Sequence, residues 1–559
     1  MAYVVTQNCC NDATCVSVCP VNCIHPTPDE PDYATAEMLY IDPEVCIDCG
    51  ACMDVCPVKA IEPDFDLSEE FLRYEDLNAQ YFRDPAHQEY AKTPTQAAER
   101  RAEWGGHGTL RVAIVGSGPA ASYAAEELLS RRGLAVQVDM FERLTVPWGL
   151  VRSGVAPDHQ ATKATADDFS RTARHQNFRL FLDVEVGEKI SHEDLDARYH
   201  AVIYAVGAMA DRRLGIPGET LPGSHSATEF VAWYNGHPDY ADRTFDLSGE
   251  RAVIIGNGNV ALDVARILLS DLETLRRTDI ADHALEQLAQ SRIREVVVVG
   301  RRGPAQAAFT TPELLGLAGS GACDLQVEPD ELAIDEATRQ WLNGNEESME
   351  LYKARLISEL GSAESTASRR VSLRFLLSPT EITGDQRVES VRLTRNQLAL
   401  ESGAVVARAT DQVEEIACGL LLRSVGYRGV AVPGLPFEDA RGVLPNESGR
   451  VVRPGSRELV NGVYTAGWVK RGPSGVIGTN KHCAQETVAA LLEDWEHGSL
   501  RATLPDHDII DLVPGHLDLA GWKAIDDHER AAGRAASRPR VKLVDRHTLR
   551  EVALGRKSA

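Results

Sequence analysis

Nine of the twelve cysteines lie before residue 57, and seven of them form two copies of one spacing pattern. The second copy reads Cys-x2-Cys-x2-Cys-x3-Cys-Pro and begins at Cys46. Thiolates at these intervals bind one iron–sulfur cluster, while the fourth cysteine reaches the other cluster of a two-cluster module. The pattern therefore predicts an iron–sulfur module in residues 1–65.

The first copy begins at Cys9 and has the same spacing, but Asp12 stands where the second cysteine belongs. Because the fourth cysteines are exchanged, one [4Fe–4S] cluster is assigned four thiolates: Cys19, Cys46, Cys49 and Cys52. The second cluster is assigned Cys9, Cys15 and Cys56. It is [4Fe–4S] if the Asp12 carboxylate is a ligand and [3Fe–4S] if it is not.

Zinc is the competing metal, since Cys-x2-Cys pairs also form tetrahedral sites. A zinc site does not need the Cys-x3-Cys-Pro tail or its repetition, so the spacing favours iron–sulfur clusters. Cys10 lies outside the repeat and Cys23 aligns with an alanine, so both are expected to be free. Residues 1–65 carry one lysine and eleven acids. This charge suits docking to a basic protein face, and it equally suits solubility.

Downstream, a glycine turn lies between two apolar runs, residues 111–115 and 136–141, that read as strands. The turn carries Gly116, Gly118 and Pro119, and a helix is expected over 120–129. A helix N-terminus in this setting offers free N–H groups to a pyrophosphate. Glu142 ends the second strand, where it can accept hydrogen bonds from a ribose. We therefore expect a dinucleotide site here.

A second fingerprint begins with a strand over 251–255, and its turn holds Asn257, Gly258, Asn259 and Val260. A helix is expected over 270–290 and a strand over 296–299. Arg301 and Arg302 follow that strand, where the first fingerprint has an acid. Two guanidiniums would bind a 2′-phosphate, so this site should take NADP(H) and the first should take FAD. The alternative is a solvated arginine pair.

The segment 463–481 holds a strand, Trp468 and a glycine-rich turn. We expect Trp468 to lie against the flavin ring and the N–H groups of Gly475, Val476 and Ile477 to face its polar edge. The three cysteines after residue 57 are isolated from one another, so this part of the chain has no dithiol. Electrons leaving the flavin are therefore expected to pass to the iron–sulfur module.

The chain has 559 residues and a net charge of −25, so it needs several cores, and neither nucleic acid nor an anionic membrane suits it. No apolar run is long enough to insert into a membrane, and no signal peptide is evident, so we expect a cytoplasmic protein. The predicted fold is an α+β ferredoxin-like domain followed by an α/β flavoprotein with two Rossmann-like dinucleotide domains. The expected order is an iron–sulfur domain (1–65), a linker (66–108), the first FAD part (109–210), the NADP domain (211–428), the second FAD part (429–500) and a helix-poor C-terminal cap (501–559).

Five motifs spread over about residues 110–490 resemble the adrenodoxin-reductase-like ferredoxin–NADP(+) reductases. They are V-G-S-G-P-A, W-G-L-V-R-S-G-V-A-P-D-H, G-N-G-N-V-A-L-D-V-A-R, R-R-G-P and A-G-W-V-K-R-G-P-S-G-V-I-G-T-N-K. The whole chain resembles bacterial members with an N-terminal seven- or eight-iron ferredoxin. The resemblance implies FAD contacts at Ala120, Glu142, Leu150, Val186, Trp468 and 475–477. It implies NADP(H) contacts at 257–260, Arg301, Arg302, Glu313 and Gly475, and it places Asp158 and His159 near the flavin as candidate catalytic residues.

One departure from the family concerns partner docking. The segment Thr311 to Leu317 lacks the arginines with which the mitochondrial enzyme binds its ferredoxin, so a basic face must lie elsewhere. Candidates are Arg171, Arg174, Arg179, Lys470 and Arg471. The expected activity is electron transfer from NADPH through FAD to the fused clusters, then to an external ferredoxin or cytochrome P450. The flow could also run in reverse. Alternatives are the reductase subunit of a larger enzyme, as in glutamate synthase, and a non-enzymatic iron–sulfur redox sensor.

Overall fold

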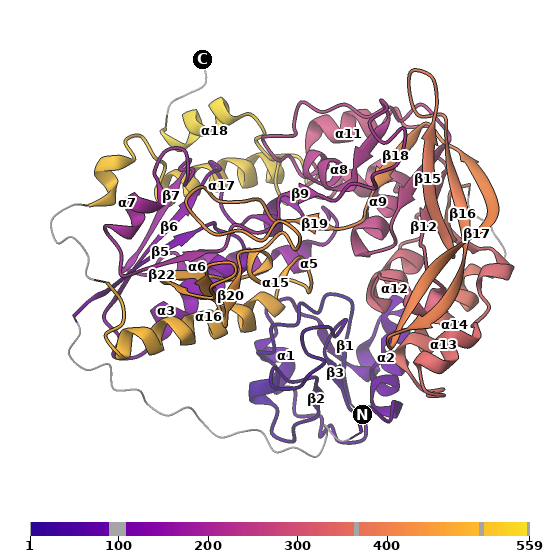
Figure 1. The fold of residues 1–559 in the computed structure, drawn as a ribbon, viewed down its shortest axis with the longest axis horizontal. Helices are drawn as coiled ribbons and strands as arrows, with labels where there is room; N and C mark the ends of the chain where they lie inside the picture. The colour runs from indigo at the N-terminus through magenta and orange to yellow at the C-terminus, as the bar shows by residue number, and fades with distance from the viewer. Residues whose placement is uncertain (1, 89–107, 363–367, 502–507, 556–559) are drawn as a thin grey trace.

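Two sheets, one mixed and one parallel, each with a glycine turn after an inner strand, form the body of the protein (Figure 1). The computed structural model describes residues 2–88, 108–362, 368–501 and 508–555. Over these ranges, no helix is both long and apolar enough to cross a bilayer.

The first sheet has the strand order β20-β21-β22-β8-β5-β6-β7. Its five parallel strands are β5 (Leu110–Val115), β6 (Val136–Glu142), β7 (Phe178–Leu182), β8 (Ala201–Tyr204) and β22 (Leu459–Thr465). The antiparallel edge is β20 (Asn446–Glu447) and β21 (Arg450–Val452). Helices α3 (Pro119–Ser130) and α16 (Thr479–Glu496) pack together on this sheet. The first sheet is therefore built from two stretches of the chain, one before and one after the second domain in sequence. Strand β22 of the later stretch pairs with β8 of the earlier one.

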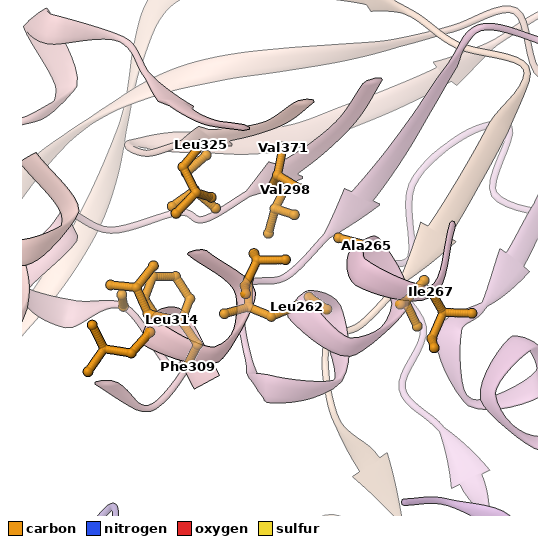
Figure 2. Packing of buried hydrophobic residues seen from close by; sticks show 14 of the residues in the cluster. Leu262, Ala265, Ile267, Val298, Phe309, Leu314, Leu325 and Val371 are labelled. Carbon is orange, nitrogen blue, oxygen red and sulfur yellow. The ribbon is translucent and has the colours of Figure 1, made fainter. Parts of the chain in front are cut away.

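The second sheet is parallel throughout, with the order β10-β18-β11-β12-β14-β13. Its strands are β10 (Ser224–Ser226), β11 (Arg251–Ile255), β12 (Glu295–Val299), β13 (Asp324–Val327), β14 (Arg370–Arg374) and β18 (Leu420–Arg423). Valine and isoleucine dominate its central strands because layers cover both faces. Figure 2 shows Val298 and Val371 on one face, with Leu262 of α9 (Asn259–Leu269) and Phe309 nearby.

A three-stranded antiparallel layer covers the second sheet, and a short ribbon joins the two domains. The layer is β15 (Leu377–Thr383), β16 (Ser390–Glu401) and β17 (Ala404–Ala417). The ribbon is β9 (Ala210–Asp211) paired with β19 (Tyr427–Arg428). Each of these strands lies where the chain passes from one domain to the other. The helices of the second domain include α8 (Ala227–Tyr234), α12 (Thr311–Gly319), α13 (Glu336–Trp341) and α14 (Met349–Gly361).

The N-terminal module has two small antiparallel ladders, as expected for a two-cluster ferredoxin fold. Strand β1 (Tyr3–Val5) pairs with β4 (Ile61–Pro63), and β2 (Ile24–His25) pairs with β3 (Tyr40–Ile41). Helix α1 (Ala51–Val55) lies within the second cysteine run and carries Cys52. Figure 1 shows this indigo module below both nucleotide domains.

Part of the range expected to be a linker is a packed helix, α2 (Leu72–Arg83). Tyr74 and Leu77 are buried in one apolar cluster with Leu314 of α12. The Tyr74 hydroxyl donates to the carbonyl of Pro312 at 3.2 Å. The prediction missed this helix because its apolar face is short and its partner is distant in sequence. The glycine-rich end of the range, from Glu103 to His107, lies outside the described residues.

Two other expectations about helices were wrong. Residues 270–290 form two short helices, α10 (Leu272–Arg276) and α11 (Asp282–Leu288), instead of one. Helix α10 ends at its C-cap Arg277, and the Thr278 hydroxyl donates to the Leu275 carbonyl where the chain turns. The C-terminal segment is rich in helix, with α17 (Leu519–Ala535) and α18 (Arg546–Ala553). Trp522 and Leu549 pack into the core of the first sheet, which supplies the burial that stabilises these helices.

A buried ion pair joins α17 to α4 (Leu150–Ser153). The two terminal nitrogens of Arg152, Nη1 and Nη2, donate to the Glu529 carboxylate at 2.9 and 2.6 Å. The Glu529 side chain is 0% exposed. Glu529→Ala would leave Arg152 buried without its partner, so we expect a loss of about 3–5 kcal/mol in the free energy of unfolding. Urea unfolding measures this loss. Glu273→Ala, which breaks an exposed pair with Arg276, should stay within about 0.5 kcal/mol of the parent protein; an equal loss in both variants would contradict the argument.

Candidate functional site

The first glycine turn is shaped to admit a phosphate. Gly116 has φ +102°, and a Cβ there would overlap the Ala205 carbonyl oxygen at the end of β8. A Cβ added to Gly118 would meet no atom within 4 Å. Pro119 begins α3, and no side chain caps the helix N-terminus. Its N–H groups therefore face open space, as a bound pyrophosphate requires.

Glu142 ends β6 beside this turn, as expected for a residue that reads a ribose. Its carboxylate is buried and accepts hydrogen bonds from the Ser117 hydroxyl at 2.6 Å and the Leu144 amide at 2.9 Å. Burial raises its pKa, and the Ser117 hydrogen bond partly offsets the rise. A carboxylate held in this way keeps lone pairs for a ribose hydroxyl.

Two distant segments reach the same turn. A Cβ on Gly149, next to Leu150, would lie 3.0 Å from the Gly118 Cα. A Cβ on Gly467, next to Trp468, would lie 2.6 Å from the Ala120 Cβ. The structure thus brings Leu150, which begins α4, and Trp468, which begins α15 (Trp468–Arg471), close to the N-terminus of α3. Val186 lies after β7 in a bridge to Ile190.

The turn expected to close over the flavin is held by hydrogen bonds to α16. The Val476 carbonyl accepts from the Thr479 hydroxyl at 2.8 Å and from the Asn480 amide at 3.0 Å, and the Ile477 carbonyl accepts from the same amide at 3.1 Å. Gly475 is exposed, with φ +76°. The N–H groups of this turn are therefore presented by a fixed loop.

The second glycine turn repeats the first. Gly256 has φ +108°, a Cβ there would overlap the Ser424 carbonyl oxygen, and Gly258 faces open space. No side chain caps α9, whereas Thr310 caps α12 in the same domain. Asn259 and Val260 begin α9, and the Asn259 amide oxygen accepts from the Thr310 backbone N–H at 2.8 Å. The Asn257 side chain lies against Gly300 at the end of β12.

Arg301 and Arg302 follow β12 without a carboxylate to neutralise them. Neither side chain forms an ion pair within the part of the chain that the structure describes. Arg301 is exposed, and burial together with the charge of Arg301 lowers the pKa of Arg302. Two adjacent guanidiniums without a carboxylate partner favour a binding site for a 2′-phosphate over the alternative interpretation, an arginine pair that is only solvated.

The two candidate catalytic residues meet the second domain through Arg266 of α9. The Arg266 guanidinium is 4% exposed and donates to Asp158 at 2.7 and 3.1 Å and to His159 Nε2 at 2.9 Å. It also donates to Asp263 at 2.6 Å, and its Nη1 lies 3.7 Å from Glu313. Sequence reasoning missed Arg266 and Asp263, although both lie in the quoted G-N-G-N-V-A-L-D-V-A-R motif.

Glu313 is the least satisfied member of this cluster. Its Oε2 is buried without a hydrogen-bond partner among the described residues, as is Arg266 Nη1. Burial raises the pKa of Glu313 to about 7, and the charge of Asp263 adds to the rise. His159, Asp263 and Glu313 are close enough to hold a metal ion, but the Arg266 guanidinium already supplies a positive charge among them. Glu313 Oε2 and Arg266 Nη1, which form no hydrogen bond within the described ranges, instead leave one acceptor and one donor that fit a polar group of a bound nucleotide.

The cysteines gather into two groups, each drawn from both copies of the motif. One cavity is lined by Cys19, Cys46, Cys49 and Cys52, together with the non-motif Cys23. In the other group, Cys9 and Cys56 pack against the same apolar cluster, and the charges that act most strongly on buried Cys15 are those of Cys9, Asp12 and Cys56, with a weaker effect of Cys52. The Cys9, Cys19 and Cys56 sulfurs accept backbone N–H hydrogen bonds at 3.3–3.5 Å. Converging thiols with N–H donors fit iron–sulfur clusters.

The module contacts the FAD-type domain through the loop from Cys10 to Asp12. The Gly478 N–H donates to the Cys10 carbonyl at 2.7 Å, and Lys481 forms an ion pair with Asp12 at 3.5 Å. On the other domain, Glu37 accepts from the Thr311 N–H at 2.6 Å and pairs with buried Lys353. Of the candidate residues for a basic docking face, Arg171, Arg179 and Lys470 form ion pairs with acids of the body.

The fold and these sites define a two-nucleotide oxidoreductase with an attached iron–sulfur module. Two family models match the chain: pyridine nucleotide-disulphide oxidoreductase over residues 110–302 and 4Fe-4S binding domain over residues 39–62. A protein of Mycobacterium bovis described as a probable ferredoxin/ferredoxin–NADP reductase is 49% identical, with 98% of this chain and 94% of that protein covered. The chain therefore belongs to the ferredoxin/ferredoxin–NADP reductase family.

Two further relatives bear on the reductase body. The mitochondrial NADPH:adrenodoxin oxidoreductase of Arabidopsis thaliana is 40% identical, over 78% of this chain and 93% of that protein. The structure of FprA from Mycobacterium tuberculosis in complex with NADPH matches with a TM-score of 0.75 and 48% identity, over 80% of this chain and 100% of that chain. The adrenodoxin-reductase-like resemblance and the predicted fold class are thereby confirmed.

Proposed function

We propose that the chain carries electrons from NADPH through FAD to its own iron–sulfur clusters, and from there to an external ferredoxin or a cytochrome P450. One observation carries the internal step. The loop that holds the ligands of the second cluster rests on Gly478, directly after the turn 475–477 that is proposed to face the flavin. The acceptor of the flavin's electrons is therefore built into the same chain.

The proposed nucleotide sites follow from the two glycine turns. FAD would lie on the turn at Gly116, Gly118, Pro119 and Ala120, with Glu142 on its ribose and Trp468 and 475–477 near its ring. NADPH would lie on the second turn, with Arg301 and Arg302 on its 2′-phosphate. FAD bound there would supply hydride acceptance from NADPH and release of single electrons. The residues of the two turns would hold the two nucleotides and exclude water from between them.

The ion pairs of Arg266 give Asp158 and His159 a positioning task in this scheme. Asp158 and His159 follow the loop that carries Leu150, whereas Arg266 lies on the NADP-binding helix α9. Their hydrogen bonds thus join the proposed flavin site to the proposed nicotinamide site. The clusters proposed for the module are one [4Fe–4S] cluster on Cys19, Cys46, Cys49 and Cys52 and a second on Cys9, Cys15 and Cys56.

Glu313 should make flavin reduction depend on pH near neutrality. Its raised pKa of about 7 means that its carboxyl gains a negative charge as the pH rises through that value. The nicotinamide becomes cationic as it loses hydride, so the charged carboxylate should favour the reaction at higher pH. We expect the stopped-flow rate of flavin reduction by NADPH to rise severalfold through about pH 7. Glu313→Gln should remove this transition, and a Glu313→Gln profile identical to that of the parent protein would assign the titration elsewhere.

Anaerobic reduction by NADPH, followed by absorbance and low-temperature EPR, tests the proposed function. The flavin should bleach and the signals of reduced clusters should follow without any added ferredoxin. Flavin reduction with clusters that stay oxidised would contradict the internal relay. NADPH oxidation with ferricyanide separates this reductase from an inactive sensor, because a sensor would show no turnover.

A further inference from the structure

Asp12 occupies the ligand position of a missing cysteine, yet its carboxylate is already engaged. Oδ1 accepts the Thr14 N–H at 3.3 Å, and Oδ2 accepts the Thr14 hydroxyl. Oδ2 also lies 3.5 Å from the Lys481 ammonium. The oxygen atoms that would bind a fourth iron are thus held by a turn within the module and by a cation from the reductase body.

Lys481 is fixed in place by the docking contact itself. It is the third residue of α16, and the Gly478 N–H just before that helix donates to the Cys10 carbonyl. The Lys481 ammonium also donates to the Thr14 hydroxyl at 2.9 Å. The side chains of Asp12 and Lys481 are 11% and 26% exposed, so water screens this pair less than it screens an ion pair on the open surface.

We propose that Lys481 holds Asp12 away from the second cluster and thereby keeps that cluster as [3Fe–4S] while the module is docked. The inference rests on the proposed function only for the assignment of Cys9, Cys15 and Cys56 as ligands. To bind iron, the Asp12 carboxylate must give up its ion pair, and the nearby ammonium repels an incoming Fe2+. Lys481 is therefore a positioning residue of the reductase body that sets the cluster type in the module.

Iron uptake by the full-length protein tests this proposal. The cluster is first reduced with dithionite, because [3Fe–4S]0 plus Fe2+ gives [4Fe–4S]2+ with no further change in electrons. Ferrous ion is then added anaerobically, excess iron is removed, and the EPR signal of the reoxidised [3Fe–4S] cluster is measured with the iron content. The parent protein should keep its signal. Lys481→Met should lose most of it and gain one iron per chain.

Three variants identify the cause. Lys481→Arg restores the cation and should keep the [3Fe–4S] signal. Lys481→Met with Asp12→Ala should also keep it, because the new ligand is gone. Lys59→Met removes the lysine of the module without touching Asp12 and should behave like the parent protein. The EPR signal of the other, reduced [4Fe–4S] cluster reports in each sample that the module is folded.

Three outcomes would overturn the proposal. The first is uptake of a fourth iron by the parent protein, and the second is retention of [3Fe–4S] by Lys481→Met. Uptake of iron by Lys59→Met would also overturn the proposal. It would mean that positive charge near the cluster prevents iron uptake whether or not that charge contacts Asp12. Reduction of the clusters by NADPH is measured on the same samples, so a failure of the proposed electron route is distinguished from a failure of this inference.

Discussion

Replacing Arg301 and Arg302 together by alanine is expected to lower kcat/KM for NADPH about 100-fold and to leave kcat/KM for NADH nearly unchanged. The two guanidiniums are adjacent and have no ion pair among the described residues, so a 2′-phosphate would be their counter-charge. Charge-assisted hydrogen bonds contribute about 1.5–3 kcal/mol each, and about 1.4 kcal/mol corresponds to a factor of ten. Steady-state reduction of ferricyanide with each nucleotide measures the change.

The matched control is Arg276→Ala with Arg277→Ala, an exposed arginine pair on the same domain. This variant removes the same net charge far from the turn that follows β12. It should keep the preference for NADPH. An equal loss in both double variants would mean that general attraction of an anionic nucleotide, and not a 2′-phosphate site, sets the preference.

Gly478→Val is expected to slow electron transfer from flavin to clusters about 100-fold while NADPH–ferricyanide activity stays within about twofold. A Cβ at this position would overlap the Cys10 carbonyl oxygen and the Asp12 nitrogen, both of which belong to the backbone. Because backbone atoms cannot rotate away, the loop that carries Asp12 must shift. A displacement of about 1 Å between reacting groups can cost about 100-fold in rate. Stopped-flow absorbance of cluster reduction by NADPH measures the effect.

Gly319→Ala is the control for this substitution. Gly319 on α12 faces the segment that follows the module, and a Cβ there would lie 4.0 Å from the Glu70 Cβ, which is ordinary contact. Cluster reduction in this variant should match the parent protein. Should Gly478→Val reduce its clusters at the parent rate, the contact at Cys10 would not be the route of the electrons.

The parts of the site that could be predicted are those with a local cause. Gly116 and Gly256 have a left-handed backbone, and this cause acts within one strand–turn–helix unit. The strand carbonyls that also exclude a side chain there, those of Ala205 and Ser424, are distant in sequence. The cysteine runs were equally readable, because their spacing reflects the shape of a cluster. The assignment of Cys19 to the group of the second run agrees with the cavity that these cysteines line.

The contacts between module and body could not be predicted, because nothing local specifies them. Asp12 and Lys481 are 469 positions apart, and either residue alone reads as an ordinary surface charge. Helix α2 was missed for a similar reason, since its burial depends on α12 and α14. Arg266 was overlooked because a helical arginine has no signal of its own until Asp158 and Glu313 are placed around it.

The burial of α2 has a consequence for how such a chain could be recombined. The Asn78 side chain bonds to Val5 and to Ile41 of the module, while Tyr74 bonds to Pro312 of the reductase. The module and the reductase body therefore share one interior through α2, instead of being two domains connected only by a linker. Exchange of residues 1–65 for another ferredoxin would remove Val5 and Ile41, the partners of Asn78, and would leave α2 on the reductase with one face uncovered. The smallest unit that can be grafted onto a related reductase ends after α2, and the receiving α12 and α14 must match its apolar face.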